Sequence, residues 1–300
     1  MAFGAATKLF MDDGYTAEDF CNCHEDFCNN LAAYLIEQEQ RLNYAELNDT
    51  LASGFANGIQ NYKRGFREAE ATHITNAEKR DEEFIFNFIS FNYTSVLERC
   101  MDAVSKKDVS LGAKRINGFV RRNQFGKVLH IHGTVFEDMV LGLNDVSQIS
   151  AMQLFEGCDE EYTNQLIKQK TNETNQHNSY EKAYELLKAS HLIYIYGMST
   201  GETDKLWWER ICDLMANNTY LHLMIHKFDA PEDGLIRRKY IQYVKHKQRE
   251  FVSYSNLDDA QKEAIMQRIH IDRTNIFSDL HDLVNNSANV QEAKEPALSN

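Results

Sequence analysis

Three short polar stretches of this sequence contain the residues whose types could do chemistry together. They read FNYT at residues 91–94, HIHG at residues 130–133 and YGMSTGETD at residues 196–204. His132 can act as a general base, because an unperturbed imidazole has a pKa of about 6.5. Asn92 offers a donor and an acceptor on one amide and can orient a water or a hydroxyl group. These residue types suit acid–base chemistry on a bound small molecule.

Each polar stretch lies at the end of an apolar run that is typical of a buried strand. Residues 84–91 are mostly apolar at both odd and even positions, which fits a strand covered on both faces, as in a parallel sheet. Further strands are predicted at residues 128–131, 139–143, 191–196, 220–225 and 269–271. Because ligands bind outside the carboxyl ends of the strands in such sheets, we expect the site at these polar ends.

Helices are predicted before and between the strands. Thr16 and Asp19 can form a capping box for an amphipathic helix over residues 17–40, whose apolar spacing includes Phe27 and Tyr34. The other predicted helices cover residues 44–70, 95–104, 180–189, 233–248 and 257–267, and one begins near Asp204; residues 156–182 are polar and predicted as an exposed helix and loop. This alternation predicts an α/β fold, a mostly parallel Rossmann-like sheet with helices on both faces.

The predicted elements divide the chain into three parts. No strand is predicted in residues 1–80, which we interpret as a helical block. Residues 81–285 form the predicted Rossmann-like α/β core, and residues 286–300 are polar, contain Pro296 and are predicted to be a disordered tail. A chain of 300 residues can bury a core without disulfides or a structural metal.

Charge and composition exclude several classes of function. The net charge of −13 and the pI near 5.3 argue against nucleic acid as a partner, because phosphate binding relies on clustered Lys and Arg. The one basic run of note, which we interpret as a solvated helix face, holds Lys239, Lys245, Lys247 and Arg249. The sequence shows no secretory signal, no disulfide framework and no apolar stretch near the roughly 20 residues of a membrane span. We therefore expect a cytoplasmic protein with no membrane partner.

Each candidate residue also has a plainer structural interpretation. Asn92 and Thr94 are good helix caps, and His132 could only fix the turn that follows it. The glycines of residues 196–204 could simply permit a tight strand-to-helix turn. Asp204 could be a helix-terminal charge that the helix dipole favours. Singly, these interpretations compete with a functional one; the joint occurrence of the three stretches favours a site.

Two groups of residues raise the question of a metal. His130 and His132 lie two apart and would share one face of a strand, but no acidic or cysteine partner is near them in sequence. Cys21, His24 and Cys28 would share a helix face, but their spacing does not fit the usual structural zinc patterns. We interpret these three as helix core and expect no metal.

The three polar stretches, in this order and at this spacing, resemble the AbiH family of bacterial phage abortive-infection proteins. Lys205, Trp207 and Trp208 follow the last stretch and strengthen the resemblance, which covers most of the chain. It implies a role in abortive phage infection. The motifs are in turn similar to those of sirtuin-like domains, in which an asparagine after a strand and a histidine in an HG pair line the NAD pocket. Defence proteins with such domains degrade NAD.

One departure from the family concerns the start of the chain. The family usually opens with a strand and a GNGFD-like glycine turn, which brings backbone N–H groups against a diphosphate. This sequence begins MAFGAA and enters the family pattern in the helical block. We therefore expect it to lack the first strand and part of any dinucleotide site.

The resemblance implies hydrolysis of NAD at its N-glycosidic bond, with Asn92 and His132 as the catalytic residues. His132 would act as a base toward a ribose hydroxyl, and Asn92 would orient a water or a ribose hydroxyl. The residues expected to contact the nucleotide are Tyr93, Thr94, Gly133, Asn144, Gly197, Ser199 and Asp204. One alternative is a non-catalytic sensor of a nucleotide or phage signal in the same pocket. Another is an interaction module whose helical block binds a partner or a second copy of the chain. The phage trigger is not identified by the sequence.

Overall fold

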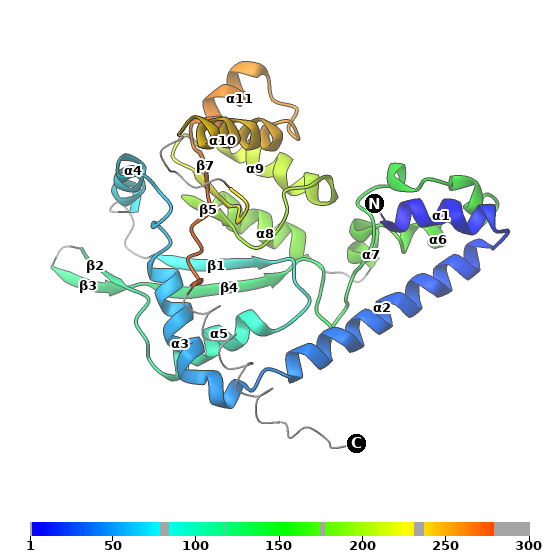
Figure 1. Cartoon of the computed structure of the whole chain (residues 1–300), viewed down its shortest axis with the longest axis horizontal. Helices are drawn as coiled ribbons and strands as arrows, with labels where there is room; N and C mark the ends of the chain where they lie inside the picture. Colours follow the sequence, from blue (N-terminus) through cyan, green and yellow to red (C-terminus); the bar gives the residue numbers. More distant parts are fainter. Residues whose placement is uncertain (1, 79–83, 117, 175–177, 231–236, 279–300) are drawn as a thin grey trace.

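The computed structural model describes residues 2–78, 84–116, 118–174, 178–230 and 237–278 (Figure 1). Within these ranges the chain forms eleven α-helices and seven strands. Strands are interspersed with helices from residue 85 onward, so the mixed α/β class expected from the sequence is confirmed. The predicted tail at residues 286–300 lies outside the described residues.

Two separate parallel sheets form the centre of the molecule. Strand β1 (Ile85–Ser90) pairs with β4 (Gln124–His130). Strand β6 (His222–His226) lies between β5 (Leu192–Ile195) and β7 (Ile269–Asp272) and is parallel to both. Five of the six predicted strands are therefore present, with bounds shifted by a few residues.

The single Rossmann-like sheet that we expected is not confirmed. Among the described residues, β1–β4 and β5–β6–β7 are distinct sheets. The strand predicted at residues 139–143 is wrong, because the pairing recorded for this segment is one isolated bridge, of Leu143 with Ile167. A third sheet, which we did not predict, is the antiparallel hairpin of β2 (Ala113–Ile116) and β3 (Phe119–Arg122).

Helices cover both faces of the β1–β4 sheet, as its two-sided apolar pattern predicts. On one face, α3 (Tyr44–Gln60) and α5 (Val96–Lys106) pack against Phe86, Phe88 and Phe125 (Figure 1). On the other face, Ile89 and Leu129 pack into a second core formed with α8 (Ser179–Lys188) and α9 (Lys205–Asn217). The remaining helices of this second core are α10 (Arg237–Val252) and α11 (Asp259–Met266).

The N-terminal helices α1 (Ala2–Asp12) and α2 (Ala17–Gln40) extend along the right side of the molecule in Figure 1. Helix α2 begins with the predicted capping box of Thr16 and Asp19. The remaining short helices are α4 (Glu68–Glu78), α6 (Glu161–Asn164), α7 (Lys168–Thr174) and the 3-10 turns η1 (Val146–Gln148), η2 (Met152–Phe155) and η3 (Glu202–Asp204).

Two predictions about burial were wrong. Helix α2 buries Phe20 at its start, but Phe27 and Tyr34 on its predicted apolar spacing are 49% and 56% exposed. Conversely, the polar residues 156–182 are not simply exposed, because Leu166, Ile167 and Lys168 are all buried. The predicted helix over residues 44–70 ends at Gln60, after which the chain turns before α4. None of the helices in the described ranges has the length and apolar character needed to cross a membrane.

Candidate functional site

The candidate site is built where the chain leaves β4. Ile131 continues the pairing with β1 by one more hydrogen bond, from its N–H to the carbonyl of Ser90 at 3.0 Å. Ile131 is buried in the core with α8 and α9, and this places the next residue, His132, at the carboxyl end of the sheet. The side chain of His132 is itself buried, with 4% exposed.

A tight turn fixes the backbone of His132. Gly133 has a φ of +70°, and a Cβ at this position would overlap the carbonyl oxygen of Asp138. The turn closes with a hydrogen bond from Thr134 N–H to the Glu137 carbonyl at 2.8 Å. Val140 N–H donates to the His132 carbonyl at 2.8 Å. Only glycine combines the left-handed φ with this close approach, which explains the HG pair.

His132 faces two charged side chains, and we refer to the three residues as the His132–Lys168–Asp204 cluster. The Nε2 atom of His132 lies 3.5 Å from Lys168 Nζ and 3.7 Å from Asp204 Oδ1. Lys168 Nζ and Asp204 Oδ1 are 3.5 Å apart. The Lys168 side chain is 9% exposed and that of Asp204 is 19% exposed. The cluster is therefore a largely desolvated ion pair in contact with an imidazole.

Lys168 reaches the cluster through a short backbone bridge. Leu143 N–H donates to the Leu166 carbonyl at 2.7 Å, and Lys168 N–H donates to the Leu143 carbonyl at 2.8 Å. Gly142 allows this approach, because a Cβ there would overlap the Leu166 carbonyl oxygen. Sequence reasoning missed Lys168; the signal was the apolar pair before it inside an otherwise polar stretch.

Asp204 is the last residue of η3 and the N-cap residue of α9. Its side chain makes no capping hydrogen bond to the helix, and its carboxylate instead faces Lys168 and His132. Asn144 Nδ2 donates to the Glu202 carbonyl at 3.1 Å and joins the loop before Lys168 to η3. The predicted role of Asn144 as a ligand contact stays a prediction; its recorded contact positions the loop beside Asp204.

Burial and charge determine the protonation of the cluster. Desolvation lowers the pKa of His132, and the Lys168 charge lowers it further, although the contact with Asp204 opposes both. Burial alone would raise the pKa of Asp204, but its contact with His132 and the charge of Lys168 outweigh burial and lower it. At neutral pH the cluster therefore contains a neutral imidazole and an ionised carboxylate. Nδ1 of His132 is buried and has no hydrogen-bond partner among the described residues.

Aromatic side chains enclose the cluster. The Phe91 ring meets the His132 ring edge-on, with centroids 5.5 Å apart, and meets Trp207 in the same way at 5.7 Å. Tyr180 stacks on Trp207 at 5.1 Å. Tyr93 donates its hydroxyl hydrogen to the Val140 carbonyl at 3.1 Å. Burial, with the nearby Cys28 and Asp204, raises the pKa of Tyr93 to about 12, so its hydroxyl stays protonated.

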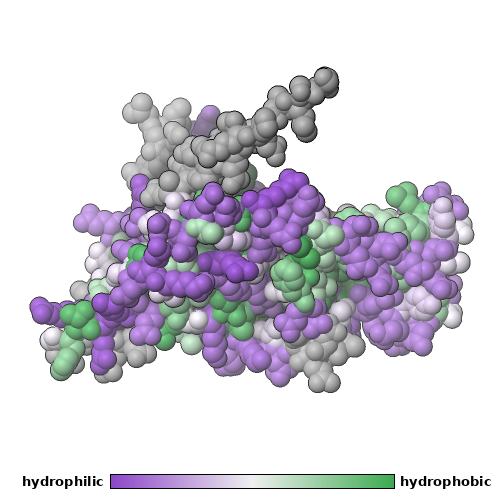
Figure 2. Space-filling view, turned by 90° about the horizontal axis from the view of Figure 1, so that it is seen from below, coloured by the Kyte–Doolittle hydropathy of each residue, from purple (hydrophilic) through white to green (hydrophobic). Residues whose placement is uncertain are grey.

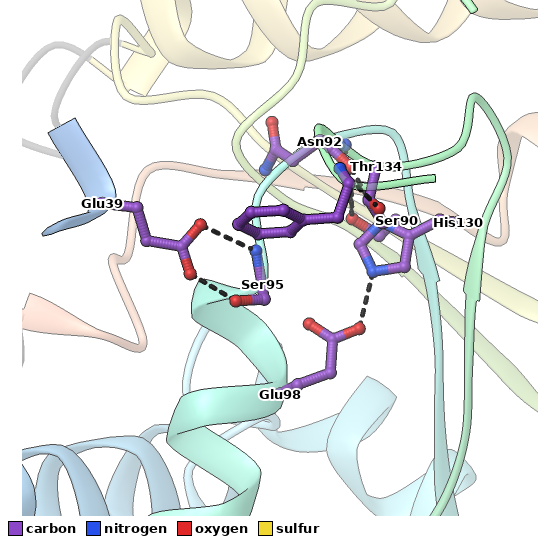
Figure 3. Close-up of polar contacts among 8 residues, drawn as sticks. Glu39, Ser90, Asn92, Ser95, Glu98, His130 and Thr134 are labelled. Atoms are coloured by element: carbon purple, nitrogen blue, oxygen red, sulfur yellow. Dashed lines mark hydrogen bonds and ion pairs between the residues drawn. The ribbon is translucent and has the colours of Figure 1, made fainter. Parts of the chain in front are cut away.

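Asn92, the other predicted catalytic residue, contributes its backbone rather than its side chain. His130 Nδ1 donates to the Asn92 carbonyl at 2.9 Å, and His130 Nε2 lies 2.6 Å from Glu98 Oε1 (Figure 3). The amide of Asn92 is exposed and points away from His130 in Figure 3. Among the described residues, no side-chain hydrogen bond links Asn92 to His132. The structure thus places Asn92 near the site but does not bring the two side chains together.

The loop that carries Asn92 is held from the far end of α2. Glu39 accepts hydrogen bonds from Ser95 N–H at 3.2 Å and from the Ser95 hydroxyl (Figure 3). Ser95 precedes α5 but makes no side-chain cap to it. Thr94 is half-buried beside it, with Glu39 and Ser95 forming the link between α2 and the end of β1.

The remaining predicted contacts lie after β5. Gly197 has a φ of +71° and opens the turn that leads to η3, and Ser199 is exposed on that turn. Thr200 is buried and accepts a hydrogen bond from Lys227 Nζ at 3.2 Å. Of this polar stretch, only Asp204 has a recorded contact with His132 among the described residues. Gly197 and Ser199 therefore stay predictions as ligand contacts.

The structure provides other contacts for the residues that raised the question of a metal. His24 Nε2 lies 3.1 Å from the Leu141 carbonyl, and Cys28 Sγ lies 3.9 Å from the same ring nitrogen. His130 pairs with Glu98, as described above. In the described part of the chain, no group of three or more His, Cys, Asp or Glu residues is arranged to hold a metal ion.

Fold and site together define an α/β protein with a buried, charged cluster beyond the carboxyl end of a parallel strand. The chain belongs to the bacteriophage abortive infection AbiH family, whose model matches residues 9–225. That range includes all three polar stretches and the whole His132–Lys168–Asp204 cluster. Membership implies a role in phage abortive infection. No curated protein and no solved structure matches the chain.

Proposed function

We propose that this protein acts in abortive infection by hydrolysing the N-glycosidic bond of NAD or a related nucleotide at the His132–Lys168–Asp204 cluster. The observation that supports this proposal is the state of His132: a buried, neutral imidazole whose Nδ1 has no hydrogen-bond partner among the described residues. Such an imidazole is a base that awaits a ligand hydroxyl or a water. The expected setting is the cytoplasm, where loss of NAD would stop the infected cell.

The proposed reaction adds one water molecule to the nucleotide. The bond between ribose C1′ and the nicotinamide nitrogen breaks, and its electron pair stays on that nitrogen, so that neutral nicotinamide leaves. The water oxygen bonds to C1′ and gives ADP-ribose. The proton lost by the water passes to His132, directly or through a ribose hydroxyl, and then to solvent.

The neighbours of His132 suit this role. The reaction uses the tautomer in which Nε2 carries the hydrogen and faces Asp204 at 3.7 Å, so that Nδ1 presents its lone pair. In this tautomer Lys168 Nζ donates to Asp204 Oδ1 at 3.5 Å, because Nε2 no longer has a lone pair to accept from it. Asp204 stabilises the imidazolium that forms during proton transfer. Lys168 lowers the pKa of His132 and so keeps the resting base neutral. Asn92 would need to turn its exposed amide inward to orient the water.

The burial of His132 Nδ1 implies a resting state in which the base is closed off from solvent. The turn at Gly133 and the loop around Asn144 would have to move before a substrate reaches it. We therefore propose that activity is held off until infection, and the assay must include infected-cell lysate.

The test measures NAD loss and nicotinamide release by the purified protein, with and without infected-cell lysate. The variants are His132→Ala and Asn92→Ala, and the matched control is His246→Ala, whose side chain is 75% exposed on α10. We expect turnover by the parent and the control and at least a 100-fold loss in His132→Ala, as removal of a general base typically produces. Thermal melting establishes that each variant is folded.

If the parent released no nicotinamide either with or without infected-cell lysate, the hydrolase proposal would be refuted. A second candidate, a non-catalytic nucleotide sensor, is favoured by one observation: Asn92 is exposed while His132 is buried, and no side-chain hydrogen bond between them is recorded among the described residues. Calorimetry would then detect NAD binding that His132→Ala weakens, without any turnover.

A further inference from the structure

The hairpin of β2 and β3 projects from the body of the molecule as an arm, at the left of Figure 1. Its register pairs Lys114 with Arg121, Arg115 with Val120 and Ala113 with Arg122. All four residues of β3 are exposed. A hairpin whose second strand is fully exposed packs little against a core, so it has no evident role in the stability of the fold.

The hairpin and the strand after it carry a concentrated positive charge. Residues 114–127 contain five basic residues and no acidic one, in a chain whose net charge is −13. Whole-chain charge argued against a nucleic-acid partner, but phosphate binding depends on local clustering of Lys and Arg. The negative net charge of the chain therefore does not argue against phosphate binding at the hairpin.

The charges are distributed over both faces of the ribbon. Directly opposed residues of an antiparallel pair point to the same face. One face therefore carries Lys114 and Arg121, and the other carries Arg115 and Arg122. Like charges directly opposite each other, as in the pair of Lys114 and Arg121, destabilise a hairpin unless an anion compensates them.

One ion pair with the body of the molecule is recorded for the arginines of the hairpin among the described residues. Arg122 Nη1 lies 3.4 Å from Asp108 Oδ1, but both side chains are well exposed, and such a surface pair contributes little. Lys114 Nζ lies over the Phe84 ring, 5.7 Å from its centroid, and this contact orders the side chain at the base of the hairpin.

Two exposed apolar residues begin β3. Phe119 is 70% exposed and Val120 is 64% exposed. At the end of the molecule where the arm lies, Figure 2 shows hydrophobic residues directly beside hydrophilic ones. An exposed aromatic ring among arginines is suited to apolar contact with base edges, such as the thymine methyl group.

We propose that the β2–β3 hairpin is a nucleic-acid-binding arm that enters a groove of duplex DNA. A two-stranded ribbon fits the major groove of B-DNA, which is about 12 Å wide and has phosphates along both walls. Cations on both faces match two walls, whereas a flat membrane surface would meet only one face. The major groove of duplex RNA is too narrow for such an arm. This inference is independent of the proposed hydrolase site.

The test measures fluorescence anisotropy of labelled 30-base-pair DNA of mixed sequence against salt concentration, with single-stranded DNA, duplex RNA and phosphatidylserine-containing vesicles as parallel probes. The test variant is Arg115→Gln/Arg121→Gln/Arg122→Gln. The matched control, Arg238→Gln/Lys245→Gln/Arg249→Gln, removes the same charge from exposed positions of α10. We expect the test variant to bind duplex DNA about tenfold more weakly or worse, with a salt slope reduced by roughly 2 to 3.

Phe119→Ala tests the contribution of the exposed ring to DNA binding separately from that of the charges. We expect roughly tenfold weaker binding with an unchanged salt slope, because an apolar contact with base edges contributes without releasing counterions. The proposal would be overturned if the α10 control weakened binding equally, or if the parent did not bind duplex DNA at about 50 mM salt. It would also be overturned if the parent bound single strands or duplex RNA more tightly than duplex DNA, or bound only to vesicles.

Discussion

The positive charge of Lys168 is balanced by one recorded carboxylate among the described residues, that of Asp204. Lys168 Nζ is buried, and Asp204 at 3.5 Å is its recorded ion-pair partner. Removal of one partner from a buried pair leaves an uncompensated charge, whereas removal of both leaves a neutral site. The cluster can therefore be tested at the level of single residues without any knowledge of the substrate.

We predict that Asp204→Asn lowers the free energy of unfolding by about 3 kcal/mol, and that Lys168→Met in the same chain restores much of the loss. Urea unfolding at pH 7 measures both. The lowered pKa of Asp204 means that its contribution is complete above the unfolded-state pKa of about 3.9 and is lost as the pH falls through the lower folded value.

The control for this prediction is Asp102→Asn. Asp102 pairs with Lys106 at 2.6 Å on the surface of α5, with both side chains at least half exposed, so its loss should change stability by less than about 1 kcal/mol. If Asp204→Asn behaved like Asp102→Asn, or if the double variant were no more stable than the single one, the paired buried charge would be refuted.

At this scale the sequence identified two of the three cluster residues. His132 and Asp204 stand in motifs at strand ends, where the topology of parallel sheets predicts a site. Lys168 stands in a polar stretch and is brought in by a single backbone bridge with Leu143, which no local pattern encodes. The Asn92 amide was expected beside His132, but a residue type does not determine which way a loop side chain points.

At the scale of elements, signals that act within a few residues were the reliable ones. Thr16 and Asp19 predicted the start of α2 correctly, because a capping box is local chemistry. The strand prediction at residues 139–143 failed because an apolar run alone does not distinguish a strand from a buried loop. The hairpin had its own signal in the Asn-Gly pair at residues 117–118, which favours a two-residue turn.

The turn after β4 makes its own prediction. Gly133→Ala would place a methyl group at a φ of +70° and against the Asp138 carbonyl oxygen. We predict a loss of about 2 kcal/mol or more in the free energy of unfolding, together with a displaced His132. Urea unfolding measures the first, and the His132 ring signals in NMR spectra report the second.

Gly157→Ala is the matched control for this turn. Gly157 has a φ of +80°, but nothing lies within 4 Å of a Cβ built there. It should cost only the backbone strain, about 1 kcal/mol, and leave the His132 signals unchanged. Equal effects of the two substitutions would mean that the close approach at Asp138 does not hold the turn.

On the scale of the whole molecule, the two parallel sheets need a physical connection, because they share no strand pairing. Phe277, which follows β7, provides one. Its ring stacks on Phe55 of α3 at 5.4 Å and meets Tyr196, after β5, edge-on at 5.1 Å. A Cβ at Gly58 of α3 would overlap the Phe277 ring, so helix and ring are in close contact. The position of α3 relative to β5 and β7 therefore rests partly on one side chain.

We predict that Phe277→Ala lowers the free energy of unfolding by about 2 kcal/mol and makes the two halves unfold separately. Both tryptophans of the chain lie in α9 and report on the core around β5–β7, whereas far-UV circular dichroism reports on all helices. The two transitions in urea should coincide in the parent and separate in the variant. Phe119→Ala, at an exposed ring, should leave them coincident and unshifted. Coincident transitions in Phe277→Ala would show instead that the interface between the β1–β4 sheet and helices α8 and α9 is sufficient to couple the halves, because that core is continuous across them.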